Sequence, residues 1–286
     1  MRGSPMPTRD GTSHHSSATA TGRWFPTPPT PGDGAARLLC LPYAGGSPVM
    51  YRNWDKELAG TAEVLPLCLP GRAHRWGEPL EHDLHGIADA VVEATVLLQQ
   101  DRPLALFGYS LGALLAFEVA RGLARRGRPP LLLIVSACAP PREFGALPPK
   151  HNLPEKEFIA LLREMGATPQ AILDREEMLS LLLPMLRSDF ALVDRYRHTP
   201  GPVLSTPIVA LAGRDDPEAG PEVMAGWARE TQQPLRRLDL DGGHMFIEED
   251  QATVIALVRA ALCTELASRF HEAGCPAGDQ NGRKFL

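Results

Sequence analysis

Short apolar runs alternate with longer amphipathic segments through the middle of this chain. Most of the runs are continuously apolar, which is the pattern of strands covered on both faces of a sheet. Six runs are predicted to be strands: Leu38–Leu41, Val64–Leu69, Leu104–Phe107, Leu131–Val135, Ile208–Leu211 and Leu235–Leu240. The segments between and after them predict helices: Tyr51–Ala59, Leu84–Gln99, Leu111–Arg126, a long region Glu155–Arg197, Pro221–Thr231 and Glu248–Leu266. This alternation predicts an α/β fold, with a mostly parallel central sheet covered by helices on both faces.

The two ends of the chain depart from this pattern. Residues 1–34 are rich in Ser, Thr, Pro and Gly and have few apolar residues before Trp24 and Phe25. Such a segment buries too little apolar surface to offset the entropy lost on ordering. We therefore expect a disordered N-terminal tail over 1–34, a folded domain over 35–270 and a flexible C-terminal tail over 271–286.

Composition limits what the chain can bind. Its 286 residues are 44% hydrophobic and 22% charged, which suits one large α/β domain. A net charge of -5 at pH 7 argues against nucleic-acid binding, because that function normally needs a basic surface. The five cysteines form no C-x-x-C pair, and no apolar run approaches the ~20 residues of a membrane span. We expect a cytoplasmic protein with no metal, no cofactor, and no nucleic-acid or membrane partner.

A Gly-x-Ser-x-Gly motif, Gly108–Gly112, stands where a predicted strand passes directly into a predicted helix. Glycines at its two ends leave room for a sharp turn, which exposes the hydroxyl of Ser110 above the sheet. A serine hydroxyl is a weak nucleophile until an adjacent base activates it. The motif predicts a nucleophilic serine, and the alternative is that Ser110 only caps the following helix.

A base and an orienting acid follow two later strands. His244 comes after two glycines at the end of Leu235–Leu240, and no other histidine follows a predicted core strand. Asp215 and Asp216 both follow Ile208–Leu211. We prefer Asp216, because the proline after it favours an extended backbone; Asp215 is the alternative, and either could simply cap a turn. The chain order Ser, Asp, His is that of the α/β-hydrolase fold.

Attack by a serine builds negative charge on an oxygen, and that charge needs backbone N–H donors nearby. The N–H of Leu111, directly after the serine, is one candidate. The second is expected from the small-residue loop Pro42–Ser47, in which Ala44 is preferred and Tyr43 is the alternative. The loop lacks the Gly-Lys-Ser/Thr ending of a phosphate-binding loop, so it makes a poor nucleotide site.

A long insertion separates two of the predicted strands. About 70 residues lie between Leu131–Val135 and Ile208–Leu211, against ~10 to 12 for a minimal crossover. We expect a helical lid at about 145–200, with Pro184 ending or kinking its second helix. Two stripes follow the i, i+3, i+4, i+7 spacing of an amphipathic helix: Phe158, Leu161, Leu162 and Met165, then Met178, Leu181, Leu182 and Met185.

The lid is predicted to enclose an apolar slot beside Ser110. The residues expected to line that slot are Phe158, Leu162, Met165, Met185 and Phe190. The alternative is that these side chains only pack on the main domain. A slot of this kind favours long apolar ligands over short ones, because each methylene that leaves water contributes about 0.8 kcal/mol.

Several strings in this order together resemble the type II thioesterases, which are stand-alone α/β-hydrolases that accompany polyketide and non-ribosomal peptide synthases. The strings are Pro42–Ser47, Leu69–Arg72 with Arg75 and Glu78-Pro79, Gly108–Gly112, Leu186–Phe190, Asp216-Pro217 and Gly242–His244. The resemblance spans about residues 24–262. One position departs from the family pattern, since Tyr109 stands where the family often has His, which questions the acyl preference rather than the mechanism.

This resemblance implies removal of stalled or misprimed acyl groups from the phosphopantetheine arm of an acyl carrier protein. It places the nucleophile on Ser110, the base on His244, the acid on Asp216 and the oxyanion donors on Ala44 and Leu111. Two other functions remain open from the sequence. A carboxylesterase or acyltransferase of the same fold would use the same triad, whereas a non-catalytic acyl-binding module would have no need of it.

Overall fold

A computed structural model of the chain describes residues 22–26, 34–96, 98, 102–145 and 148–274. Its centre is a six-stranded sheet in which every neighbouring pair is parallel, in the order β2-β1-β3-β4-β5-β6. The strands are β1 (Ala36–Leu41), β2 (Ala62–Pro66), β3 (Leu104–Tyr109), β4 (Leu132–Ser136), β5 (Ile208–Gly213) and β6 (Arg236–Leu240). All six predicted strands are confirmed, and so is the α/β-hydrolase fold class.

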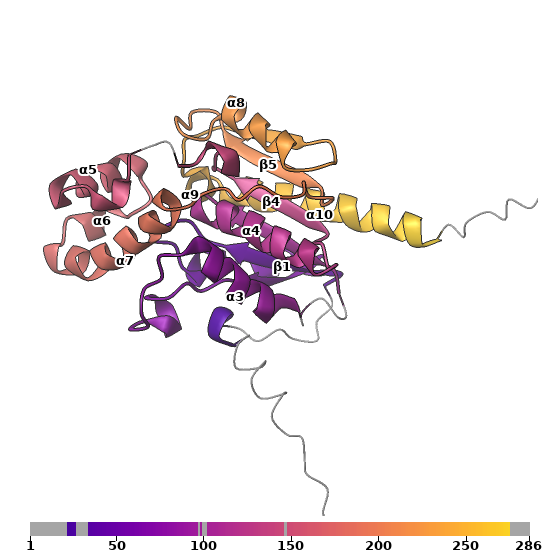
Figure 1. The fold of residues 1–286 in the computed structure, drawn as a ribbon, viewed down its shortest axis with the longest axis horizontal. Coiled ribbons are helices and arrows are strands. Elements are labelled where there is room, and N and C mark those ends of the chain that lie inside the picture. Colours follow the sequence, from indigo (N-terminus) through magenta and orange to yellow (C-terminus); the bar gives the residue numbers. More distant parts are fainter. Residues whose placement is uncertain (1–21, 27–33, 97, 99–101, 146–147, 275–286) are drawn as a thin grey trace, which may run out of the picture.

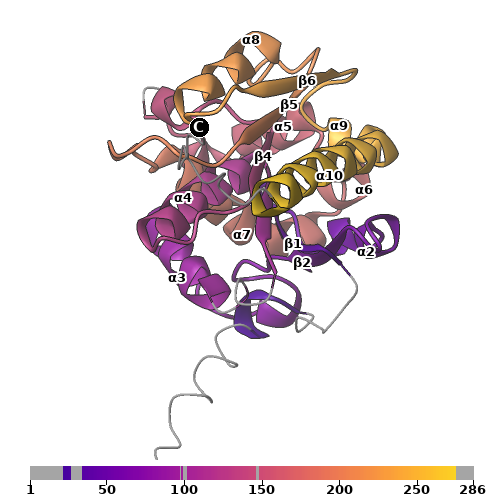
Figure 2. The same cartoon turned by 90° about the vertical axis from the view of Figure 1, so that its right-hand side faces the viewer.

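Helices cover both faces of the sheet (Figures 1 and 2). On one face, α3 (Leu84–Val96), α4 (Leu111–Arg125) and α8 (Pro221–Met224) pack against alternate strand residues such as Leu39 and Leu41. On the other, α2 (Trp54–Glu57), α9 (Phe246–Glu249) and α10 (Gln251–Gly274) pack against the residues between them, such as Leu38 and Cys40. Because both sets of strand side chains are buried, the strands read as continuously apolar runs.

Several predicted helices are shorter or divided in the structure. The prediction over Tyr51–Ala59 becomes the 3-10 helix η1 (Pro48–Tyr51) and the single turn of α2. Pro221–Thr231 divides into α8 and the 3-10 helix η6 (Ala225–Arg229). The last helix divides at Asp250, whose backbone leaves the helical region between α9 and α10.

Two residues assigned to the N-terminal tail belong to the folded domain. Trp24 and Phe25 are 6% and 1% exposed and join the core on the α3 side of the sheet. The Trp24 carbonyl accepts a hydrogen bond from the Cys68 N–H, and the guanidinium of Arg75 stacks over the indole ring at 4.3 Å. The tail prediction is therefore wrong for these residues, while 1–21 and 27–33 lie outside the described residues.

The C-terminal helix also departs from expectation. Helix α10 continues to Gly274, past the predicted end of the folded domain at residue 270, and 275–286 lie outside the described residues. Over Gln251–Arg269 it is long and apolar enough, by length and composition alone, to cross a membrane. This corrects the expectation that no stretch approaches that length. In the structure, one side of α10, which includes Val254 and Val258, is buried in the core on the α2 side of the sheet.

Among its described residues, the insertion between β4 and β5 contains three α-helices grouped at one end of the sheet (Figure 1). They are α5 (Glu155–Met165), α6 (Gln170–Leu173) and α7 (Glu176–Asp194), and we refer to them as the lid helices. Helix α5 ends at Gly166, which adopts the left-handed conformation that favours glycine. The lid helices bury a small core of their own, formed by Phe158, Leu162, Leu173, Leu179, Leu183, Met185, Leu186 and Phe190.

Helix α7 corrects two predictions. Of the two outcomes predicted for Pro184, an end of the helix is wrong, because Pro184 lies inside α7. Pro184 and Ser180 are both on the exposed side, where water can bond the carbonyl that proline leaves unpaired. The predicted apolar stripe is also wrong, since Met178 and Leu181 are 40% and 63% exposed. The buried stripe is instead Leu179, Leu183, Leu186 and Phe190.

We predict that Trp24 is a structural anchor of the N-terminal segment. Trp24→Ala should lower the free energy of unfolding by about 3 kcal/mol, because it removes a large buried ring. Urea denaturation measures this change. Trp76→Ala is the matched control: Trp76 is 58% exposed, so its loss should cost no more than about 0.5 kcal/mol. Equal, small changes in both variants would contradict the anchor.

Candidate active site

Ser110 lies in a strained turn between β3 and α4. Its φ of 51° is positive, which is rare for a residue with a side chain. A Cβ at Gly108 would lie 2.2 Å from the Gly112 carbonyl oxygen, and one at Gly112 would lie 2.1 Å from that of Leu41. Both glycines are therefore required for the turn to close. Ser110 makes no side-chain capping hydrogen bond to α4, so the capping alternative does not describe its contacts.

The imidazole of His244 lies between Ser110 and Asp216. Its Nε2 is 3.1 Å from the Ser110 Oγ, and its Nδ1 is 2.9 Å from the Asp216 Oδ2. A carboxylate only accepts hydrogen bonds, so Nδ1 carries the proton and Nε2 is left to accept one from the serine hydroxyl. The structure thus brings together three of the predicted site residues, which come from the ends of β3, β5 and β6.

Asp216 is held in one orientation by its surroundings. Its side chain is fully buried, and its Oδ1 accepts hydrogen bonds from the N–H groups of Glu218 and Ala219 at 2.9 and 3.0 Å. Burial by itself raises the pKa of Asp216, but the bond to His244 and the two backbone bonds outweigh burial and lower that pKa. Asp215, the alternative, is exposed and makes no hydrogen bond to His244.

Tyr109 anchors the loop that carries His244 through a hydrogen bond to its backbone. Its hydroxyl donates a 2.6 Å hydrogen bond to the His244 carbonyl, and its ring is fully buried against Phe246. Burial raises the pKa of Tyr109, so the hydroxyl keeps its proton for this bond. Tyr109 is absent from the walls of the cavity beside Ser110, so its contacts assign it to the histidine loop and not to acyl preference. The sequence shows only that it neighbours the serine.

The predicted oxyanion donors have free N–H groups. Within the described part of the chain, neither the Ala44 N–H nor the Leu111 N–H has a hydrogen-bond acceptor. Ala44 is in a tight turn, Tyr43–Gly46, closed by a 2.8 Å bond from the Gly46 N–H to the Tyr43 carbonyl. The φ of Gly45 is +82°, as in the third position of a type II turn. The alternative donor, the Tyr43 N–H, likewise has no acceptor among the described residues, and the Tyr43 hydroxyl donates to Glu248.

A cavity of about 630 Å³ opens beside Ser110 and His244. Its walls combine the main domain with the segment that precedes the lid helices and with Val193 of α7. Apolar wall residues include Leu111, Leu114, Ala137, Phe144, Val193 and Val223, and the charged ones are Glu143, Lys150 and Glu218. Cavities of this size and character suit ligands with an apolar body. Among the described residues, no group of three or more His, Cys, Asp or Glu side chains is arranged to hold a metal ion.

The five predicted lid residues do not line this cavity. Phe158, Leu162, Met185 and Phe190 are buried in the small core of the lid helices, and Met165 is half-buried at its edge. Phe158 and Phe190 pack edge-to-face with ring centres 5.2 Å apart. The slot prediction is therefore wrong for these residues, because an inserted unit of three helices buries its large side chains against one another first. Val193, near the end of α7, is the lid-helix residue that lines the cavity.

Comparisons with known proteins agree with the geometry. The family described as Thioesterase domain matches residues 36–262. Thioesterase PikA5 of Streptomyces venezuelae is 38% identical over 231 residues, which cover 79% of each chain. RedJ, a thioesterase from the prodiginine biosynthetic pathway in Streptomyces coelicolor, superposes with a TM-score of 0.75 at 32% identity, over 84% of this chain and 98% of its own.

BorB, a type II thioesterase from the borrelidin biosynthetic cluster, superposes with a TM-score of 0.73 at 32% identity. The match covers 84% of this chain and 96% of BorB. The resemblance to type II thioesterases is thereby confirmed. The chain is an enzyme that belongs to the thioesterase family.

Proposed function

We propose that this enzyme hydrolyses acyl thioesters through an acyl-serine intermediate, with Ser110 as nucleophile, His244 as base and Asp216 as the acid that orients the histidine. The observation that supports this most directly is the row of contacts from a buried carboxylate, through one imidazole, to a serine hydroxyl at the cavity wall. Each of the three groups has the partner that its role requires.

In the first step, the Ser110 Oγ attacks the thioester carbonyl carbon while His244 Nε2 takes the hydroxyl proton. The imidazolium that forms is stabilised by Asp216, whose lowered pKa keeps the carboxyl ionised. Negative charge develops on the carbonyl oxygen, where the N–H groups of Ala44 and Leu111 would bind it. The C–S bond then breaks, His244 returns its proton to the departing sulfur, and the acyl group stays on Ser110 as an ester.

In the second step, water replaces the thiol. His244 takes a proton from the water as its oxygen attacks the acyl-serine carbonyl, and the same two N–H groups bind the new oxyanion. The bond between the acyl carbon and Oγ breaks, and the proton on Nε2 passes to Ser110. A free carboxylic acid leaves, and the enzyme returns to its starting state.

The substrate we propose is an acyl group on the phosphopantetheine arm of an acyl carrier protein. The names of the relatives support this, because RedJ and BorB are both named from biosynthetic pathways or clusters. Removing aberrant or stalled acyl groups from a polyketide or non-ribosomal peptide synthase in the cytoplasm is the corresponding role. The apolar cavity walls favour medium or long acyl chains over acetyl.

Loss of the nucleophile should abolish turnover without unfolding the enzyme. Ser110→Ala should reduce kcat for an acyl-pantetheine thioester by about 10⁴-fold, measured by thiol release. Ser180→Ala, an exposed serine on α7, is the control and should match the wild type. Turnover of Ser110→Ala within tenfold of the wild type would remove the proposal. A wild-type preference for simple oxygen esters over thioesters would favour the carboxylesterase alternative.

The two neighbouring aspartates should differ sharply. Asp216→Asn removes the carboxylate that fixes the His244 tautomer, so kcat should fall by about 10³-fold or more. Asp215→Asn alters an exposed side chain and should leave kcat within about threefold of the wild type. Steady-state kinetics on one thioester compares them directly. Equal effects would show that the acid is not Asp216.

A larger side chain in the cavity wall should shorten the preferred acyl chain. Val193→Phe narrows the cavity beside Ser110, so the ratio of kcat/KM for a long-chain over a short-chain thioester should fall by about tenfold. Leu181→Phe, exposed on the same helix, is the control and should keep the wild-type ratio. An unchanged ratio in Val193→Phe would mean that the acyl chain lies elsewhere.

A further inference from the structure

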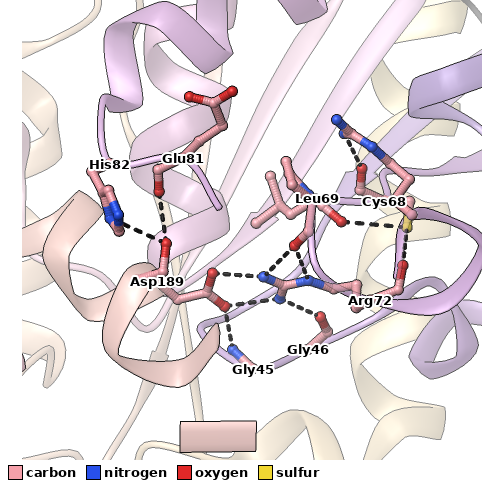
Figure 3. A network of polar contacts seen from close by, with 11 residues as sticks. Gly45, Gly46, Cys68, Leu69, Arg72, Glu81, His82 and Asp189 are labelled. Atoms are coloured by element: carbon pink, nitrogen blue, oxygen red, sulfur yellow. Dashed lines mark hydrogen bonds and ion pairs between the residues drawn. The ribbon is translucent and has the colours of Figure 1, made fainter. Parts of the chain in front are cut away.

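A buried ion pair lies directly behind the Tyr43–Gly46 turn (Figure 3). Arg72 donates from Nη2 to Asp189 Oδ1 at 2.6 Å and from Nη1 to Oδ2 at 2.8 Å, in the two-pronged geometry that arginine and carboxylates favour. The two side chains are only 5% and 2% exposed. Neither residue touches the cavity beside Ser110, so the acyl-transfer steps leave this pair without a role.

Both members of the pair also bond the backbone of the turn. The Gly45 N–H donates to Asp189 Oδ2 at 2.7 Å, and Arg72 Nη1 donates to the Gly46 carbonyl at 2.9 Å (Figure 3). The turn is thus held on the two residues that follow Ala44. Two neighbouring N–H groups of the turn therefore differ. The Gly45 N–H donates to Asp189, whereas the Ala44 N–H has no acceptor among the described residues.

The pair joins three segments that are far apart in the sequence. Asp189 comes from helix α7, Arg72 from the loop after β2, and the turn from the loop after β1. Arg72 is itself fixed by two 3.4 Å bonds to the Pro70 carbonyl. Close packing supports the same junction, since a Cβ at Gly45 would lie 2.6 Å from a methyl carbon of Leu186.

Stability alone does not account for such a pair. Taking two charges out of water is costly, and apolar residues of similar volume often serve a folded core equally well. What the pair supplies is a fixed orientation of the turn. The two-pronged bond to Arg72 holds the Asp189 carboxylate in one orientation, and the carboxylate then fixes the Gly45 N–H. An oxyanion donor needs such a fixed orientation, because it lowers the energy of the transition state most when its N–H already points at the oxygen before the charge develops.

We propose that Arg72 and Asp189 are positioning residues for the oxyanion site, and that they act by fixing the Tyr43–Gly46 turn so that the Ala44 N–H faces the developing oxyanion. Through Asp189, the position of the lid helix α7 is coupled to that of the oxyanion donor. This inference rests on the proposed function, because it assumes that Ala44 stabilises the oxyanion formed on attack by Ser110.

The test replaces the pair by apolar residues of similar size. The double variant Arg72→Met/Asp189→Leu removes the acceptor of the Gly45 N–H and leaves no buried charge behind. We expect it to fold and to show a kcat about 10- to 100-fold below the wild type with KM little changed, because only transition-state binding is weakened. The pH profile of kcat should keep its shape, because the pair has no contact with His244.

Ser188→Ala is the matched control. Ser188 is the neighbour of Asp189 on α7 and docks that helix through a 2.7 Å bond to the Glu81 carbonyl, without contacting the turn. Its loss should leave kcat within about threefold of the wild type. An equal fall in kcat for Ser188→Ala and the double variant would overturn the proposal. It would show that kcat depends on the docking of α7 and not on the orientation of the Tyr43–Gly46 turn.

A second variant decides the outcome if the double variant does not fold. In Asp189→Asn, one amide oxygen replaces the two carboxylate oxygens that serve three donors, so the turn loses part of its anchor. A fall in kcat of about tenfold or more is expected, with KM little changed. Wild-type kcat in either folded variant would overturn the proposal.

Two further measurements separate this inference from the proposed function. If the wild type releases no thiol from acyl-pantetheine, or if Ser110→Ala keeps wild-type turnover, the proposed function fails. Hydrogen exchange of the Gly45 amide tests the anchor without any turnover. It should be faster in the double variant than in the wild type and unchanged in Ser188→Ala, and equal rates in all three proteins would overturn the anchor itself.

Discussion

The close approach of β1 to the start of α4 is the constraint on which the site depends. At Gly112 the helix backbone lies so near the end of β1 that a Cβ would meet the Leu41 carbonyl oxygen at 2.1 Å. The same contact forces Ser110 into a positive φ and raises its hydroxyl above the sheet. It also fixes where β1 ends, and therefore where the Tyr43–Gly46 turn begins. One steric contact thus exposes the Ser110 hydroxyl and sets the start of the turn that carries the proposed oxyanion donor.

The other half of the site has a similar origin. Strands β5 and β6 are parallel neighbours with Gly213 opposite Leu240, so the loops after them leave the same edge of the sheet side by side. A Cβ at Gly213 would lie 2.6 Å from the Gly243 carbonyl, which brings the Asp216 and His244 loops into contact. Tyr109, directly before the nucleophile, then bonds the His244 carbonyl and ties this half to the first. The proposed catalytic groups are therefore positioned by contacts within the protein itself, without any substrate.

Short-range patterns predicted the sheet and the Ser, His and Asp positions, since a buried parallel strand and a strand-to-helix turn each leave a local signature. The predictions that were wrong concern residues whose position is set by contacts with residues far away in the sequence. Trp24 and Phe25 are two aromatic residues in an otherwise polar segment, and no nearby sequence pattern predicts that the guanidinium of Arg75 stacks over the Trp24 ring. Helix α7 contains two apolar stripes one position apart, and packing within the core of the lid helices buries the stripe that contains Leu183, while Leu181 in the other stripe is exposed.

The lid helices show why a residue type alone is a weak guide to a binding site. A small helical insertion has few neighbours, so its large apolar side chains, such as Phe158 and Phe190, are used to hold the helices together. Among the contacts of α7 with the main domain is a charged group, Asp189, at a position that apolar periodicity does not reveal. Because that carboxylate bonds the Gly45 N–H directly, α7 cannot leave its place without releasing the turn that carries Ala44. Under the proposed function, the lid helices therefore influence the chemistry through the backbone of the Tyr43–Gly46 turn, and Val193 of α7 is the lid-helix residue that lines the cavity beside Ser110.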